Sequence, residues 1–469
     1  MGREMSLPFP IFSKNKSHRF IARPAIVTAY GFDKETRMAI YIADSATDTQ
    51  ARAPSVTRVY AWTVFALTFG LLMSDYMSRQ VLNAIFPIIK AEWGLSDTQL
   101  GSLSSIVALL VGLLTFPLSV LADRWGRVKS IVLMACLWSL ATLGCALSTN
   151  YNEMFAARFF VGVGEAAYGS VGIALILSIF PVQLRSTLTG AFMAGGAIGS
   201  VLGMATGGVI ATQFGWRWAF TIMAAFGLVL VILYCVVVTE RRLGAQATRQ
   251  ISGQERPPAF RRLLRGLFAS KAVRFTYIGS GLQLFIMAAM IAWIPSYLNR
   301  YYHLPTDKAA LIAGVFLLAG GAGMVLCGMV TDRLSREIPI RKWRVAIAYS
   351  LISSILLLAA FQLPPGMPQL VLIGAGMLLV GGTSGPAGAM VGNLTPPAIH
   401  ASAFATLTLA NNLLGLAPGP FLTGVMADRI GLLGALQIIP LASMAAAVAF
   451  AFGRRYYTAD SKRIQAGEY

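Results

Sequence analysis

The sequence predicts an all-α membrane protein with twelve transmembrane helices in two six-helix bundles. Three observations carry this prediction. Of the 469 residues, 56% are hydrophobic and only 12% are charged, whereas a soluble globular domain carries about 25% charged residues. The apolar residues gather in runs long enough to cross a bilayer, which takes about 20 residues of helix. A basic stretch in the middle of the chain leaves six runs on each side.

The runs are residues 59–89, 98–121, 129–148, 152–178, 187–211, 218–239, 275–298, 308–330, 345–362, 369–391, 402–426 and 434–452. The basic stretch predicts a linker with a short amphipathic helix around Phe260–Phe268 on the lipid surface. The predicted parts are a tail (1–57), a first bundle (58–239), the linker (240–274), a second bundle (275–453) and a tail (454–469).

The first tail, residues 1–57, is polar and has no long apolar stretch of the kind found in a signal peptide. We expect it to be disordered and cytoplasmic. Whether it belongs to the native protein stays open, with Met38 as an alternative start.

Lys and Arg are spread unevenly over the loops. If the N-terminus is inside, 31 of the 38 lie in inner loops and tails and five in outer loops. Such an excess marks the cytoplasmic side of membrane proteins, so the prediction is N-in/C-in. The net charge of +19 then reflects topology, and we expect no nucleic-acid partner.

Enzyme chemistry finds little support in the residues. The four cysteines lie in apolar runs without metal-ligand spacing, and the three histidines are scattered over loops and the tail. The sequence shows neither a nucleophile–base set nor a phosphate-binding loop. We therefore expect no enzyme activity, no cofactor and no metal.

Arg158 and Glu165 stand seven residues apart inside the fourth apolar run. Seven residues make about two helical turns, so the two side chains project from nearly the same face. A charge at membrane depth costs roughly 2.5–3.5 kcal/mol on insertion scales. The pair therefore predicts a transporter in which Glu165 carries a proton and Arg158 binds a carboxylate or phosphate. The alternative is a buried ion pair that only fixes helix packing.

The first run adds a second charged group. Asp75 and Arg79 are spaced i, i+4 and can pair on one helix face. We predict that Asp75 shares in proton coupling and that Arg79 and Tyr76 bind substrate. Alternatively, Arg79 reaches the outer boundary of the membrane.

No acidic residue lies deep within a run of the second half. The predicted substrate contacts there are Gln283, Trp293, Asn411 and Asn412. The alternative for such side chains is packing between helices.

Two predicted inner loops repeat one pattern, with an Asp-Arg pair directly after the second and the eighth run. We predict a gating loop that holds the halves together when the inside is closed. Its residues are Asp123, Arg124, Gly126, Arg127, Asp332 and Arg333. The alternative is that the basic residues only set topology.

The first of these loops resembles the major facilitator superfamily, whose motif is G-x-L-A-D-R-x-G-R-R/K. It is met by Leu121, Ala122, Asp123, Arg124, Gly126 and Arg127, with Ser119 in place of the first Gly, and the second half has a degraded copy at Gly328, Asp332 and Arg333. The resemblance covers residues 58–454. It implies two bundles that rock around a central cavity.

Within the superfamily, the run Gly162-Val-Gly-Glu165-Ala-Ala-Tyr168-Gly169 is similar to the spinster-like group. That group offers an Arg and a Glu two turns apart in the fourth span, matched by Arg158 and Glu165. It also has an Asp-Arg pair in the first span, where this chain has Ser78-Arg79. Eukaryotic members are associated with export of sphingosine phosphate or lysophospholipids.

Together these features predict a proton-coupled secondary transporter of an amphipathic or organic anion, including a lysolipid- or sphingolipid-like solute. The alternatives are an organic- or aromatic-acid:proton symporter, a multidrug exporter and, in another class, a lipid scramblase or receptor. The expected partners are a small-molecule or lipid-like substrate, protons and membrane lipids. We expect a monomer in a bacterial inner (plasma) membrane. The substrate, the direction and the stoichiometry stay open.

Overall fold

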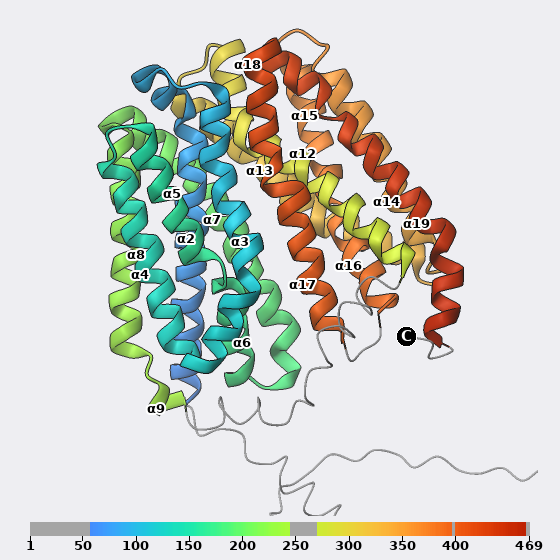
Figure 1. Cartoon of the computed structure of the whole chain (residues 1–469), viewed down its shortest axis with the longest axis horizontal. Coiled ribbons are helices and arrows are strands. Elements are labelled where there is room, and N and C mark those ends of the chain that lie inside the picture. The colour runs from blue at the N-terminus through green and yellow to red at the C-terminus, as the bar shows by residue number, and fades with distance from the viewer. Residues whose placement is uncertain (1–56, 244–269, 396–398, 466–469) are drawn as a thin grey trace, which may run out of the picture. The chain divides into compact units, whose positions relative to one another are not determined.

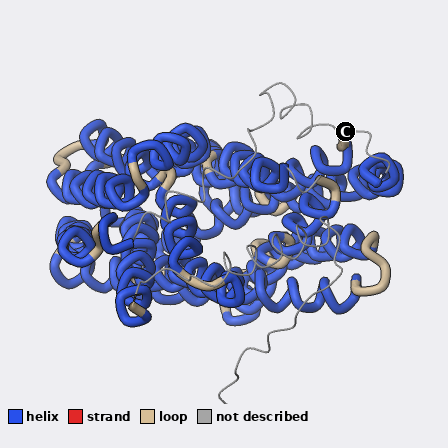
Figure 2. Tube along the Cα trace, turned by 90° about the horizontal axis from the view of Figure 1, so that it is seen from below, coloured by secondary structure: helices blue, strands red, loops and turns tan. Residues whose placement is uncertain are grey.

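The computed structural model describes residues 57–243, 270–395 and 399–465. The tail and the amphipathic helix predicted around Phe260–Phe268 lie outside these residues, except for Thr57. Everything described belongs to one compact unit, Pro54–Tyr469. The described residues are helices joined by short connections, without a strand (Figure 2).

The described part of the first half contains nine elements. They are α2 (Arg58–Trp93), α3 (Asp97–Trp125), α4 (Arg127–Leu147), α5 (Tyr151–Glu165), α6 (Tyr168–Ile179), the 3-10 turn η1 (Val182–Leu184), α7 (Arg185–Phe214), α8 (Trp216–Val237) and α9 (Glu240–Leu243).

The second half contains the remaining elements. They are α12 (Lys271–Tyr301), α13 (Thr306–Ser335), α14 (Arg341–Ala360), α15 (Met367–Gly381), α16 (Ser384–Asn393), α17 (His400–Asn411), the π-helical turn η3 (Asn412–Leu416), α18 (Pro418–Ile438) and α19 (Leu441–Gln465).

Ten helical segments of the described chain are long and apolar enough to cross a membrane. Three of them join shorter elements, namely α5 with α6, α15 with α16, and α17 with η3 and α18. With α2 and α19 the number of helices that match the predicted runs is twelve. The prediction of an all-helical membrane protein is thus confirmed.

Two glycines set turns that the chain needs. Gly126 has φ 104° and ends α3 while it begins α4. Gly431 has φ 78° and separates the eleventh from the twelfth predicted run inside α18. Residues with a Cβ rarely adopt such a φ, so glycine fits both positions. The last helix, α19, continues through residue 465 and so includes much of the segment expected to be a tail.

The most extensive contacts between the two halves are those of α3 with α18, α7 with α13 and α2 with α12 (Figure 1). The first of these crossings is very close. A Cβ on Gly101 would lie 2.4 Å from the carbonyl oxygen of Pro420, and one on Gly424 would lie 2.3 Å from that of Asp97. Small residues allow this approach of two helix backbones.

Because successive helices run in opposite directions, the connections gather at two ends. We call the end with the α2–α3 connection, next to Asp97, the Asp97 end. The opposite end, with the α3–α4 turn next to Asp123, is the Asp123 end.

Candidate substrate cavity

A cavity of about 110 Å³ lies between the two halves of the chain. Its first wall comes from α2, α3 and α5, and its second from α12, η3 and α18. The lining residues are Arg79, Gln80, Asn83, Ser104, Val107, Ala108 and Arg158 on the first wall, and Ala288, Ile291, Ala292, Leu416 and Pro420 on the second. All of its polar side chains therefore belong to the first half.

Arg158, on α5, is the most enclosed cation of this wall, with only 2% of its surface exposed. Its Nε donates to the carbonyl oxygen of Leu103 at 3.3 Å. Its Nη1 has no hydrogen-bond partner among the described residues. A buried donor without a partner is costly, so this guanidinium has capacity for an anionic ligand in the cavity.

Glu165 pairs with Arg79 of α2. Arg79 Nε lies 2.5 Å from Glu165 Oε2 and 3.4 Å from Asp75 Oδ1. Asp75 and Glu165 are each 3% exposed. The two carboxylates thus approach one guanidinium from α2 and α5. The Asp75–Arg79 contact is the one that the sequence predicts, whereas Glu165, expected beside Arg158, is paired with Arg79 instead.

Two further α2 side chains border this cluster. Ser78 is buried, and its hydroxyl donates to the backbone oxygen of Asp75 at 2.7 Å and to Glu165 Oε1 at 3.5 Å. The Arg79 guanidinium lies over the ring of Tyr76, with Arg79 Cζ 5.2 Å from the ring centroid. Such cation–π contact helps to hold an arginine in place.

Three polar residues of the cavity wall were not among the predicted site residues. Ser104 of α3 donates to Asn83 Oδ1 at 2.6 Å, and Asn83 Nδ2 donates to Gln80 Oε1 at 2.8 Å. Their signal in the sequence was present but weak. Asn83 stands four residues after Arg79, one helical turn along the same face.

The predicted contacts of the second half lie outside the cavity lining. Gln283 is buried between Ser350 and Ser443, donating to the first at 2.5 Å and accepting from the second at 3.0 Å. Trp293 donates its indole N–H to the Pro420 carbonyl at 3.0 Å. Both side chains therefore hold helices of the second half together in this structure.

The two asparagines lie where α17 passes into the π-helical turn η3, Asn411 as the last residue of α17 and Asn412 as the first of η3, and this turn ends at the cavity residue Leu416. Asn412 donates to the carbonyl oxygen of Thr408 at 2.9 Å, while its own Oδ1 and that of Asn411 are buried without a hydrogen-bond partner among the described residues. A π-helical turn is rare and often marks a functional position.

The predicted gating loops contact their own half in this conformation. Arg127 pairs with Asp123 at 3.4 Å and donates to the carbonyl oxygen of Ala174 at 3.1 Å. Asp332 pairs with Lys342 at 3.4 Å. Arg124 and Arg333 are exposed. Gly126 lies against Glu240, where a Cβ would come within 2.3 Å of the carboxylate.

Comparison with known proteins agrees with this architecture. The family model described as Major Facilitator Superfamily matches residues 68–417. A probable L-galactonate transporter of Escherichia coli is 27% identical over 70% of this chain and 73% of its own length. A probable sphingolipid transporter, spinster homolog 1 of Arabidopsis thaliana, is 26% identical over 73% of this chain and 74% of its own.

Among solved structures, a bacterial homolog of the human lysosomal transporter Spinster, in an inward-facing and unoccupied conformation, has a similar fold. Its TM-score is 0.73 at 19% identity, covering 87% of this chain and 98% of that one. The resemblance to spinster homologues is therefore confirmed.

Proposed function

The chain belongs to the Major Facilitator Superfamily of secondary transporters, and on that premise we propose that it couples protons to the transport of an organic anion. One observation carries the proposal. Two arginines line the cavity between the two halves. Arg79 is paired with the carboxylate of Glu165, and Arg158 has an N–H group without a hydrogen-bond partner among the described residues.

The charges around the cavity supply a coupling device. Two carboxylates, Asp75 and Glu165, stand against two guanidinium groups, Arg79 and Arg158. A bound anion would leave a buried excess of one negative charge, which is expensive in a low-dielectric site. Protonation of Glu165 removes that excess and loosens Arg79 toward the cavity. Anion and proton therefore favour each other's binding, and this coupling is reciprocal.

The cation Arg158 and the apolar wall of Ala288, Ile291 and Ala292 suit an anion with an apolar body. The similarity to a probable sphingolipid transporter supports a lipid-like solute of this kind.

A second candidate, an organic-acid:proton symporter, is favoured by a different observation. Gln80, Asn83 and Ser104 place amide and hydroxyl groups beside the arginines, where they can bind the hydroxyl groups of a small acid. The small volume of the cavity and the similarity to a probable L-galactonate transporter point the same way.

The proposed membrane is a bacterial inner membrane, with the Asp123 end in the cytoplasm. The support is the loop charge, because the basic connections 123–130 and 332–344 both lie at that end.

The test is solute uptake into proteoliposomes across an imposed pH gradient. Radiolabelled L-galactonate and sphingosine phosphate represent the two solute classes. We expect one of them to accumulate with the gradient and to stop accumulating when a protonophore collapses it. Lipid movement that ignores the gradient would instead indicate a scramblase, and retention of ligand without movement would indicate a receptor.

A further inference from the structure

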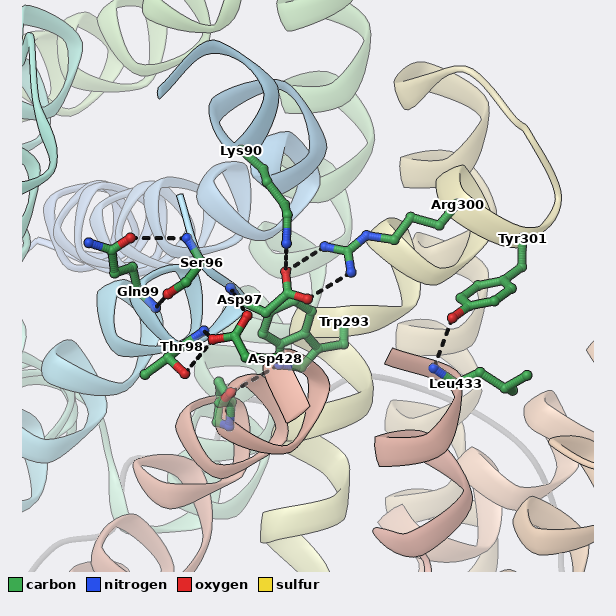
Figure 3. Close-up of polar contacts among 11 residues, drawn as sticks. Lys90, Ser96, Asp97, Thr98, Gln99, Trp293, Arg300, Tyr301, Asp428 and Leu433 are labelled. Carbon is green, nitrogen blue, oxygen red and sulfur yellow. Dashed lines mark hydrogen bonds and ion pairs between the residues drawn. The ribbon is translucent and has the colours of Figure 1, made fainter. Parts of the chain in front are cut away.

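A cluster of charges joins the two halves at the Asp97 end (Figure 3). Its centre is the carboxylate of Asp97 on α3, whose side chain is only 4% exposed. Lys90, from α2 of the same half, lies 2.5 Å from Oδ1. Arg300, from α12 of the other half, binds both oxygens, with Nη2 at 2.6 Å from Oδ1 and Nη1 at 2.8 Å from Oδ2. A bidentate arginine–carboxylate contact of this kind is among the stronger polar interactions.

A second carboxylate also links the two halves, and here the acid belongs to the second half and its partners to the first. Asp428 of α18 accepts the backbone N–H groups of Asp97 and Thr98, each at 2.8 Å, and the hydroxyl of Thr98 at 2.6 Å. These N–H groups begin α3 and have no partner within the helix. The acid of one half therefore completes the helix start of the other, at the end where a negative charge is favourable.

Each side of the cluster is held as a unit. On the second half, Trp293 donates to the Pro420 carbonyl and the Tyr301 hydroxyl accepts the Leu433 N–H, so α12 and α18 are joined at two positions near Arg300 and Asp428 (Figure 3). On the first half, Ser96 and Gln99 form a capping box around the start of α3. The cluster can therefore open between the halves without rearranging either of them.

The three helices that meet here also line the cavity. Ser104 of α3 is seven residues from Asp97, Ala292 of α12 is eight from Arg300, and Pro420 of α18 is eight from Asp428. At 1.5 Å per residue, these spacings amount to roughly 10–12 Å along each helix. Separating α3 from α12 and α18 at the cluster would thus open the cavity toward the Asp97 end.

We propose that the Asp97–Arg300 ion pair and the hydrogen bonds of Asp428 to the start of α3 together form a gate that closes the transport path at the Asp97 end. The balance of charges makes the gate reversible. When the halves part, the first keeps Lys90 with Asp97, and the second keeps one cation, Arg300, and one anion, Asp428. Neither half is left with a net charge in the cluster. Opening therefore costs the contacts between the halves but leaves no unpaired charge.

Lys90 then acts as the partner that Asp97 keeps in the open state. Removing it leaves the closed state supported by Arg300 but strips the open state of its ion pair. Removing Arg300 does the reverse. Replacing Lys90 and replacing Arg300, the two basic partners of Asp97, are therefore expected to shift the equilibrium between the closed and the open state in opposite directions.

The experiment measures access to the cavity from each side of the membrane, without any substrate. Ala108, a cavity residue on α3, is replaced by Cys in full-length protein whose four native cysteines are Ala. A membrane-impermeant maleimide is added to intact cells or to inverted vesicles. Gln362→Cys, in an exposed connection at the Asp97 end, identifies the side on which that end lies.

From that side, Arg300→Ala and Asp428→Ala are expected to raise the labelling rate at position 108 by on the order of tenfold, as loss of a charge-assisted contact implies. Lys90→Met is expected to lower it. The matched control is Glu92→Gln, which breaks an ion pair with Arg217 that stays inside the first half, and it should label like wild type.

Equal labelling in Arg300→Ala, Asp428→Ala and wild type would overturn the gate, as would a Lys90→Met rate that rises with theirs. Spin labels at Thr149 and Gln362, one in each half at the Asp97 end, give a second measurement. Their separation should lengthen in Arg300→Ala. Because neither readout needs a transported solute, failure of the gate can be told apart from failure of the proposed function.

Discussion

The Nε atom of Arg79 lies 2.5 Å from Oε2 of Glu165, across the contact between α2 and α5. Glu165 therefore pairs with a residue of the first helix, although Arg158 stands two turns away on its own helix. The two arginines therefore have different proposed roles. Arg79 is tied to the group proposed to carry the proton, and Arg158 keeps a donor for the substrate.

Replacing Glu165 by Gln should abolish accumulation driven by a pH gradient while leaving exchange of solute partly intact. Gln keeps the shape of the side chain but cannot take up or release the proton, and it leaves Arg79 available to the anion at every pH. Uptake and counterflow in the same proteoliposomes separate the two activities. Glu153→Gln serves as the control, because Glu153 caps the exposed start of the same helix. Gradient-driven accumulation at the wild-type level in Glu165→Gln would remove this carboxylate from the coupling.

Replacing Arg158 by Ala should weaken anion binding by about 10- to 100-fold, the range expected when a hydrogen bond to a charged group is lost. Arg158→Lys should recover only part of the affinity, because an ammonium group lacks the planar fork of donors. Titration calorimetry on purified protein gives the affinities. Arg217→Ala, at a half-exposed arginine of the same bundle, should bind as wild type does. An unchanged affinity in Arg158→Ala would place the anion elsewhere.

The helices could be predicted from the sequence because each needs a long apolar run, and the length of that run is set by the bilayer. The break at Gly431 falls between two predicted runs because the bilayer also limits where each of those runs ends. The charged members of the site, Asp75, Arg79, Arg158 and Glu165, were also visible, because ionised groups inside apolar runs are rare.

What the sequence did not reveal is which residues meet across helices. The spacing on one helix suggested that Glu165 pairs with Arg158, but the packing of the helices brings Arg79 of α2 to it instead. Neutral polar residues such as Asn83 and Ser104 resemble ordinary residues of helix contacts. The contact of Arg300 with Asp97 spans 203 residues, and no local pattern announces such a pair.

Replacing Asn83 by Ala should distinguish the two substrate classes. Asn83 links Gln80 and Ser104 along the cavity wall, so its loss removes neutral hydrogen bonds, each contributing about 0.5–1.5 kcal/mol. For a hydroxylated acid we expect the affinity to fall roughly two- to tenfold, whereas a lipid-like anion that rests on the apolar wall should bind almost unchanged. Competition of both ligands against one labelled solute measures this. If both affinities fall equally, the side chain shapes the cavity without selecting the substrate.

Replacing Gly101 by Ala should destabilise the crossing of α3 and α18. The added Cβ would lie 2.4 Å from the Pro420 carbonyl oxygen and 3.1 Å from the Phe421 Cα, both of them backbone atoms that cannot rotate away. Overpacking of this kind costs about 1–3 kcal/mol, so the melting temperature of the purified protein should fall. Gly190→Ala on α7 is the matched control, because its Cβ meets nothing within 4 Å and Ala favours helix over Gly. Since Gly101 lies about one turn beyond Asp97, its substitution should also raise labelling of position 108 from the Asp97 side. A Gly101→Ala protein that melts with wild type and labels at the wild-type rate would show that the two helices have room at this crossing.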